Sequence, residues 1–373
     1  MIKGGVPIGR VFGIPIRLHY SWFFIFALIT WALATSYFPL THPTWTQGMS
    51  VAAGLITSLL FFGSVVFHEL MHSRVALAQG MTVQSITLFI LGGVSQITEE
   101  PKQAKDEFRM AFAGPLSSLV LGGVFWGIGL WTANTNQFIS AVALWVGYIN
   151  IILGIFNLIP GFPLDGGRVL RSLIWWRNQN LQSATRIASN IGRGIGYLGI
   201  FGGIWLIFTG NWWNGIWFAL IGWFLESAAA GSYRQLMLQD MLQGHTAGEI
   251  MTRDCLAVSP DITVERLVNE NILTTGRRCF PVVAGNRLEG LVTLDNVRSV
   301  PRDRWPTAIL KETMTTLDHL KSVGPNESLS NVLKIMTESD INQVPVVQDS
   351  NVIGMVSRDN LLNFINLQSS VRA

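Results

Sequence analysis

The chain has 373 residues and a formal net charge of +3, and only 13% of its residues are charged. Its 14 tryptophans, 21 phenylalanines and mean hydropathy of +0.38 are typical of a membrane protein with a polar part attached. The basic residues are scattered or flank apolar segments, so nucleic-acid binding has little support. The first 17 residues lack the cleavage site of a removable signal peptide, and we expect the first span to be retained.

Acidic residues divide the chain into two regions. Six of the 23 acids precede Glu226, and the other seventeen lie from Glu226 onward. We therefore predict a transmembrane domain over residues 1–232, a linker over 233–246 and a soluble domain over 247–373.

Six apolar segments are long enough to cross a bilayer. They are centred on residues 18–38, 51–78, 108–131, 138–159, 191–208 and 212–230. The connections over 36–50, 132–137 and 209–214 contain no Lys or Arg, whereas the alternate connections are basic. By the positive-inside rule the alternate connections are cytoplasmic. This pattern predicts a multi-pass protein of the cell membrane with both termini in the cytoplasm.

The second apolar segment contains the motif His68-Glu69-Leu-Met-His72, and Glu69 is the first acidic residue of the chain. Ionisable groups are costly inside a bilayer unless they have a function. On a helix, His68 and His72 project from one face and can bind one Zn²⁺, with Glu69 as the general base for an attacking water. The alternative is two buried histidines, bonded to neighbouring helices, beside a stray glutamate.

Residues 81–98 are β-branched, partly alternating and interrupted by Gly92-Gly93, which predicts two short strands. Open strand edges cannot face lipid, so this ribbon must lie at the interface or inside the protein beside a wet cavity. An ordinary cytoplasmic hairpin is the alternative.

A catalytic zinc usually has three protein ligands, so one more is needed. Asp165 is the only acid between residues 108 and 225, and it follows Pro160 and Pro163, which must break the fourth span. We expect Asp165 to be the third ligand; its alternative role is as N-cap of the following helix. Asn157 could donate to the oxyanion of a scissile carbonyl, or else bridge helices as a buried amide.

These motifs together resemble the site-2 protease family of intramembrane zinc metalloproteases. The resemblance rests on His-Glu-Leu-Met-His, on Asn-x-x-Pro-x-x-Pro-Leu-Asp-Gly-Gly-Arg, on the Gly-Gly strand segment and on Ala113-Gly114-Pro115. It implies that His68, His72 and Asp165 bind one Zn²⁺, that Glu69 is the base and that Asn157 assists the substrate carbonyl. It further implies that residues 89–94 dock an unwound substrate helix as a strand. Ser118 stands where some branches of the family have Asn, a departure that concerns subgroup.

The C-terminal region contains an internal repeat at an interval near 64 residues. Phe-Pro-Val-Val at 280–283 recurs as Val-Pro-Val-Val at 344–347, and Gly-Leu-Val-Thr at 290–293 recurs as Gly-Met-Val-Ser at 354–357. The repeat resembles a tandem pair of CBS modules over about 247–302 and 310–367. Such pairs often bind adenine nucleotides through a ribose-binding Asp, but Asn296 and Asn360 stand at those positions. Nucleotide binding is therefore doubtful, and a structural or dimerising role, with a homodimer formed through the CBS pair, is the alternative.

The predicted fold is a multi-span α-helical membrane protein, with six transmembrane helices and a small β-ribbon, followed by a cytosolic α/β tandem CBS module. The predicted function is that of an intramembrane zinc endopeptidase which hydrolyses a peptide bond within or next to a transmembrane segment of another membrane protein, near the cytoplasmic face. A transporter or channel regulated by its CBS pair is the alternative from another class. A zinc-binding but inactive scaffold would require the loss of the base or a ligand, and none is lost.

Overall fold

The computed structural model describes residues 5–90, 92–98, 100–253, 256–277, 279–285, 287–316, 320–348 and 351–372. The chain forms two compact units, Met1–Arg234 and Gln235–Ala373, which are described separately. The predicted linker over 233–246 overlaps the end of a long helix that continues to Leu242.

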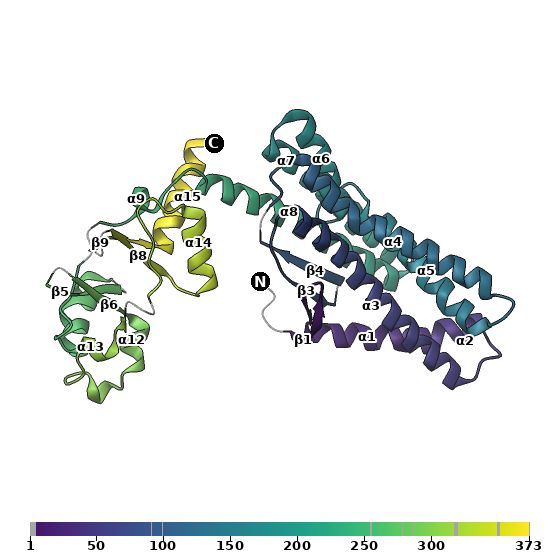
Figure 1. The fold of residues 1–373 in the computed structure, drawn as a ribbon, viewed down its shortest axis with the longest axis horizontal. Helices are drawn as coiled ribbons and strands as arrows, with labels where there is room; N and C mark the ends of the chain where they lie inside the picture. Colours follow the sequence, from purple (N-terminus) through teal and green to yellow (C-terminus); the bar gives the residue numbers. More distant parts are fainter. Residues whose placement is uncertain are drawn as a thin grey trace. The chain divides into compact units, whose positions relative to one another are not determined.

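The first unit is built from long helices (Figure 1). These are α1 (Tyr20–Ala32), which continues through a π-helical turn (Leu33–Tyr37) into α2 (Phe38–Thr41), then α3 (Gln47–Ala78), α4 (Ala104–Thr132), α5 (Gln137–Asn157), α6 (Asp165–Asn178), α7 (Leu181–Phe208) and α8 (Trp212–Leu242). Within the described residues, five helical stretches are long and apolar enough to cross a membrane, namely Tyr20–Thr41, α3, α4, α5 and α7. The expected multi-span helical architecture is confirmed.

The sixth predicted span corresponds to α8, which is not among those five. Its apolar part includes four tryptophans and Glu226, and these residues lower its hydropathy although it is long enough to cross. The short helix α6 lies between the fourth and fifth predicted spans and begins at Asp165.

A four-stranded sheet accompanies the helices. Its strands are β1 (Val6–Val11), β2 (Ile14–Leu18), β3 (Val83–Phe89) and β4 (Gly92–Ile97), in the order β1-β2-β3-β4. The predicted ribbon is the antiparallel pair β3–β4, and β2 pairs in parallel with β3. The β1–β2 hairpin was not predicted from the sequence.

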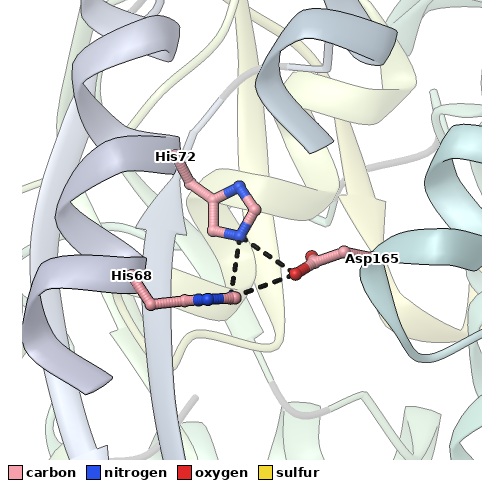
Figure 2. A group of neighbouring side chains, drawn as sticks. All are labelled: His68, His72 and Asp165. Carbon is pink, nitrogen blue, oxygen red and sulfur yellow. Dashed lines mark hydrogen bonds and ion pairs between the residues drawn. The ribbon is translucent and has the colours of Figure 1, made fainter. Parts of the chain in front are cut away.

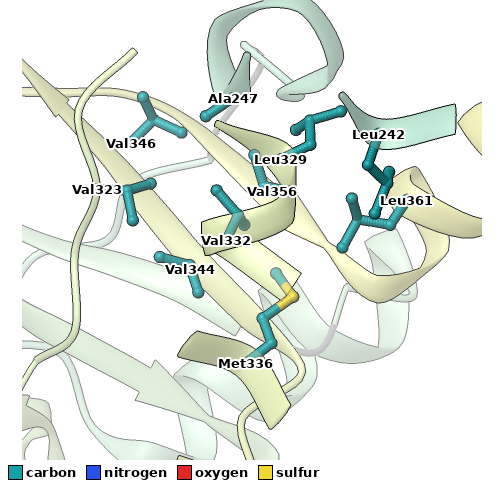
Figure 3. Packing of buried hydrophobic residues seen from close by; sticks show 10 residues of the cluster. All are labelled: Leu242, Ala247, Val323, Leu329, Val332, Met336, Val344, Val346, Val356 and Leu361. Carbon is teal, nitrogen blue, oxygen red and sulfur yellow. The ribbon is translucent and has the colours of Figure 1, made fainter. Parts of the chain in front are cut away.

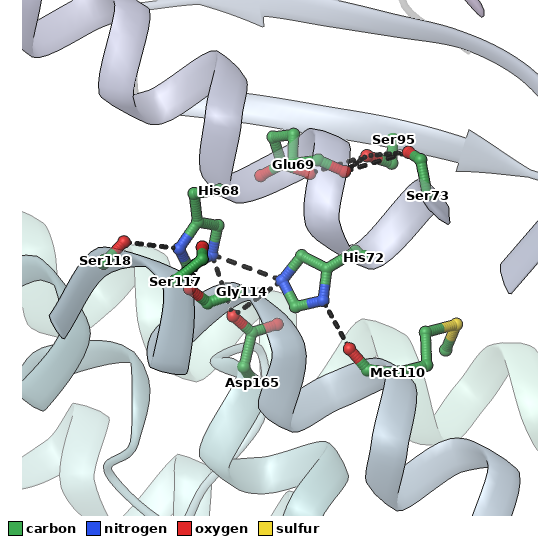
Figure 4. Close-up of polar contacts among 10 residues, drawn as sticks. All are labelled: His68, Glu69, His72, Ser73, Ser95, Met110, Gly114, Ser117, Ser118 and Asp165. Carbon is green, nitrogen blue, oxygen red and sulfur yellow. Dashed lines mark hydrogen bonds and ion pairs between the residues drawn. The ribbon is translucent and has the colours of Figure 1, made fainter. Parts of the chain in front are cut away.

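The sheet packs against α3 beside the His-Glu-Leu-Met-His turn. Leu70 of α3 contacts Ile14 of β2 and Ile86 of β3, and all three side chains are buried. This contact fixes one side of α3 against the sheet. The opposite side of the same turn, which bears the histidines, faces α4, as Figure 4 shows.

Glycines allow α4 and α5 to approach closely. A Cβ added at Gly147 of α5 would lie 2.8 Å from the backbone nitrogen of Trp126, and one added at Gly122 of α4 would lie 3.0 Å from the nitrogen of Ile151. Small residues at such crossings are typical of helix packing in membranes. The backbones of α4 and α5 therefore lie in close contact at these glycines.

The second unit is an α/β structure with two small sheets. The first sheet contains β5 (Cys279–Ala284), β6 (Arg287–Thr293) and β7 (Thr315–Thr316), and the second contains β8 (Gln343–Gln348) and β9 (Asn351–Ser357). The main helices are α12 (Leu294–Ser299), α14 (Leu329–Glu338) and α15 (Arg358–Arg372). Shorter helical pieces are α9 (Ala247–Ile250), α10 (Val264–Arg266), the π-helix Leu267–Ile272, α11 (Leu273–Thr275), the 3-10 turn Arg302–Arg304 and α13 (Leu310–Thr313).

Each repeat of this unit has its own apolar core, completed by the segment that precedes the other repeat. The core in Figure 3 joins Leu242 and Ala247 to Val332, Val344 and other residues of the second repeat. The other core includes Ala308 and Leu310, which precede the second repeat, together with residues of the first. The two repeats are therefore interlocked within one unit.

Candidate active site

Two histidines of α3 and the first residue of α6 meet at one point (Figure 2). His68 and His72 are only 4% and 6% exposed, and Asp165 is largely buried. The Nε2 atoms of the histidines are 3.2 Å apart, and each lies 3.1 Å from Oδ2 of Asp165. The structure therefore brings together three of the residues predicted for the site, across 97 residues of sequence.

The second nitrogen of each imidazole is held by α4 (Figure 4). His72 Nδ1 donates to the carbonyl oxygen of Met110 at 2.7 Å, and His68 Nδ1 lies 2.9 Å from Oγ of Ser118. Because a carbonyl can only accept, His72 in its neutral form must present the lone pair of Nε2 toward His68 and Asp165. These contacts orient both rings in the way that partners of metal-binding histidines do.

The spacing of the three atoms fits a metal ion. Two ligands of a tetrahedral zinc, each about 2.0–2.1 Å from the ion, lie roughly 3.3 Å apart. The observed separations of 3.1–3.2 Å are close to this value. Two imidazoles and one carboxylate are also a usual donor set for catalytic zinc, so the residues fit Zn²⁺.

Gly114 of α4 leaves room for the two rings. A Cβ at this position would lie 2.1 Å from His72 Nε2 and 2.7 Å from His68 Nε2, so no side chain can replace it without displacing them. Gly114 lies between Met110 and Ser118 along α4, at spacings of four residues that share one helix face. One face of α4 therefore packs against both imidazole rings and supplies their hydrogen-bond partners.

Asp165 is positioned by the chain around it. It is the first residue of α6, and Leu164 rather than Asp165 occupies the N-cap position, so the alternative N-cap role is not observed. A Cβ at Gly166 would lie 2.3 Å from the carbonyl oxygen of Leu158, and one at Gly167 would lie 2.4 Å from the carbonyl carbon of Gly161. The two glycines let the first turn of α6 pack directly on the preceding loop.

A buried ion pair connects α4 and α6 near Asp165. Arg171 of α6 donates through Nε to Oε1 of Glu107 at 2.7 Å, and Arg168 lies 4.0 Å from the same oxygen. Glu107 is fully buried, and Oε2 of its carboxylate has no hydrogen-bond partner. A buried carboxylate requires this pairing, so the contact fixes α6 relative to α4.

Glu69 does not contact the cluster of His68, His72 and Asp165 directly, and it lies on another side of α3 (Figure 4). Figure 4 shows Glu69 on the side of α3 toward β4, where Ser95 Oγ donates to its Oε2 at 2.8 Å. Asn157 is the half-buried last residue of α5. Sequence analysis noted Ser118 only as a marker of subgroup, and it missed Met110, Ser95 and the Glu107–Arg171 pair altogether.

Comparison with known proteins identifies the family. The model of peptidase family M50 matches residues 56–136 and 130–198, and the CBS domain model matches residues 247–303 and 310–367. A protein of Synechocystis sp. named as a zinc metalloprotease is 32% identical over 380 residues, which is 99% of this chain and 97% of that protein. This chain belongs to peptidase family M50.

A second curated relative of this M50 peptidase agrees. Rip3 of Mycobacterium tuberculosis, also named as a zinc metalloprotease, is 32% identical over 98% of this chain and 94% of its own length. The solved site-2 protease from Methanocaldococcus jannaschii is 28% identical, covers 62% of this chain and 96% of its own, and has a TM-score of 0.42.

The protein is thus a site-2 type zinc metalloprotease, a multi-pass membrane protein with a C-terminal CBS pair. It is an intramembrane protease, and this activity implies a membrane-protein substrate. These relatives give no support to the alternative of a transporter or channel.

Proposed function

We propose that His68, His72 and Asp165 hold one Zn²⁺ and that Glu69 is the general base of peptide hydrolysis. The observation on which this rests is the convergence of His68 Nε2, His72 Nε2 and Asp165 Oδ2 at 3.1–3.2 Å, with both Nδ1 atoms engaged on α4. When each of these atoms presents a lone pair, they repel one another unless a cation or a proton lies between them. An ion-binding role explains an arrangement that two separate structural histidines would not need.

Zn²⁺, when bound, would polarise the scissile carbonyl and make the attacking water more acidic. Glu69 would accept a proton from that water and deliver it to the amine of the leaving peptide. Asn157, at the end of α5, would donate to the oxygen of the carbonyl as it gains negative charge. The other role for Asn157, as an amide that bridges helices, predicts little loss of turnover in Asn157→Ala.

We further propose that the site faces the cytoplasm. Support comes from the basic residues that flank alternate connections, among them Arg74, which follows His72 by two positions. On this topology α8 is the sixth span and both termini are cytoplasmic, with a membrane domain over 1–232, a linker over 233–246 and the CBS pair over 247–373.

The topology is tested with single cysteines introduced at Pro43 and at Gln179. In intact cells, an impermeant thiol reagent should label the cysteine at position 43 and leave the one at position 179 unlabelled. Labelling of position 179 from outside would overturn this topology.

The substrate would bind as an added strand. β4 is the last strand of its sheet, and among the described residues its outer edge has no strand partner. An extended peptide can add to such an edge through main-chain hydrogen bonds. The predicted docking segment over 89–94 includes the start of β4, although Leu91 lies outside the described residues.

For the CBS pair we propose a role in assembly or substrate choice, with a homodimer as one form, and little or no binding of adenine nucleotides. The Oδ1 atom of Asn296 accepts from Thr293 in a capping box, and Oδ1 of Asn360 accepts from the backbone nitrogen of Ser357. Both side chains are therefore already used by local structure at the positions where a ribose-binding carboxylate would stand.

The proteolytic proposal is tested by expressing single-span membrane proteins with the wild type and with Glu69→Gln at equal levels. The variant should retain zinc, because the proposed ligands remain, and should cleave roughly 10²- to 10⁴-fold more slowly. Zinc is measured on the purified protein and cleavage by the appearance of the shorter product. Wild-type turnover by Glu69→Gln would remove Glu69 as the base.

A further inference from the structure

The carboxylate of Glu69 is held by a serine of the edge strand β4. Ser95 Oγ lies 2.8 Å from Oε2 of Glu69 and 3.1 Å from the backbone oxygen of the same residue. A hydroxyl has one proton to donate, and a bond to a carboxylate is stronger than one to a neutral carbonyl. We therefore assign the proton of Ser95 to the carboxylate.

A second serine completes this arrangement on α3. Ser73 donates to the backbone oxygen of Glu69 at 2.9 Å and lies 3.2 Å from Ser95 Oγ (Figure 4). Ser73 thus satisfies the carbonyl that competes for the proton of Ser95. The hydroxyl of Ser95 stays available to Oε2 of Glu69.

Gly93 of β4 shapes the space that Glu69 occupies. Residues two apart in a strand point to the same face, so Gly93 and Ser95 both face α3. A Cβ at Gly93 would lie 2.6 Å from Cγ and 3.2 Å from Oε1 of Glu69. The side chain of Glu69 therefore rests on the backbone of β4, where a larger residue would displace it.

We propose that Ser95 is a positioning residue for Glu69, so that β4, the strand proposed to receive the substrate, also holds the carboxylate of the base in place. This inference rests on the proposed role of Glu69. With Oε2 held by Ser95, Oε1 remains the oxygen that takes the proton of the attacking water.

The experiment uses the full-length, zinc-loaded protein in detergent and the single-span reporter that is cleaved in the comparison above. Ser95→Ala should lower kcat by roughly 10- to 100-fold, as expected for a displaced catalytic group, with KM and zinc content little changed. Ser95→Thr, which keeps the hydroxyl, should recover most of kcat. The matched control is Ser85→Ala, because Ser85 is a buried serine of the neighbouring strand whose hydroxyl donates to Gln96; it should behave like the wild type.

A second variant covers the case in which Ser95→Ala does not fold. Gly93→Ala keeps the hydroxyl but pushes Glu69 away, so it should also lower kcat while zinc is retained. Wild-type kcat in either Ser95→Ala or Gly93→Ala would overturn the proposal, as would loss of zinc from Ser95→Ala.

The outcomes also separate this proposal from the proposed role of Glu69. If Glu69→Gln is inactive while Ser95→Ala turns over normally, only the positioning role fails. If Glu69→Gln is active, the proposed base fails and the role of Ser95 fails with it.

Discussion

The two units use polar side chains in different ways. In the membrane unit, the polar atoms of His68, His72 and Asp165 converge on one point and do little for local structure. In the CBS unit, the side chains of Asn296 and Asn360 form hydrogen bonds that cap helices and link the two repeats. Side chains that local structure does not need are the stronger indication of chemistry, since burying them without a partner costs free energy.

The largest effect should come from the ligand set. Asp165→Ala removes one of three acceptors, so zinc content of the purified protein should fall to a small fraction and cleavage to background. Asp106→Ala removes a different carboxylate, in the first turn of α4, and should leave zinc bound. Metal analysis with unchanged stoichiometry in Asp165→Ala would show that Asp165 is not a ligand. The polar cluster of the membrane unit would then no longer differ in its use from the asparagines of the CBS unit.

The next effect concerns the support of α6. Arg171→Met leaves Glu107 buried without its partner, which should cost about 3–5 kcal/mol of stability. The double variant Glu107→Gln, Arg171→Met should be less destabilised than the single one, because no charge remains unpaired. Arg168→Met is the control, since Arg168 is 4.0 Å from the carboxylate and partly exposed. Thermal unfolding in detergent measures all three, and equal midpoints for Arg171→Met and Arg168→Met would contradict the buried pair.

How much of this site could be predicted depended on sequence distance. His68, Glu69 and His72 were predicted because a helix places them by local geometry, and Asp165 because it was the only acid available in a long apolar region. The Glu107–Arg171 contact joins residues 64 apart, and helix packing rather than any local pattern decides it. Nothing in a single sequence distinguishes Ser95 or Met110 from their neighbours.

The same limit explains the missed β1–β2 hairpin. Its two-residue turn is Phe12-Gly13, with positive φ at both residues, 50° and 81°. Such turns usually have Asn or Asp before the glycine, and a phenylalanine there gave no signal. The ribbon β3–β4 was predicted because Gly92-Gly93 interrupts a β-branched run. The repeats of the CBS unit were recognised by comparing the chain with itself, which needs no contact information.

A smaller effect should follow from the imidazole partners. Ser118→Ala leaves the ligands in place but frees the ring of His68, so zinc affinity should fall roughly 10- to 100-fold. Ser117→Ala is a matched control, because this buried hydroxyl donates to the backbone oxygen of Gly114. Competition with a chelator measures the affinity. Equal affinity of the Ser118→Ala protein and the wild type would show that packing alone orients the ring.

The smallest effect is expected in the CBS unit. The amide nitrogen of Asn360 donates to Thr252 at 3.2 Å, and that of Asn296 lies 3.4 Å from Thr315 Oγ1, so each side chain links the two repeats as well as capping a helix. An amide that replaces a carboxylate also binds a ribose diol less strongly.

A nucleotide that binds with a dissociation constant of about 1 mM, present at about 1 mM, would stabilise the protein by only about 0.4 kcal/mol. Calorimetry on the full-length chain should therefore detect weak binding or none, and the Asn296→Asp, Asn360→Asp variant should bind more tightly. A micromolar constant for the wild type would mean that other residues contact the ribose, and the CBS unit would then also contain a ligand site.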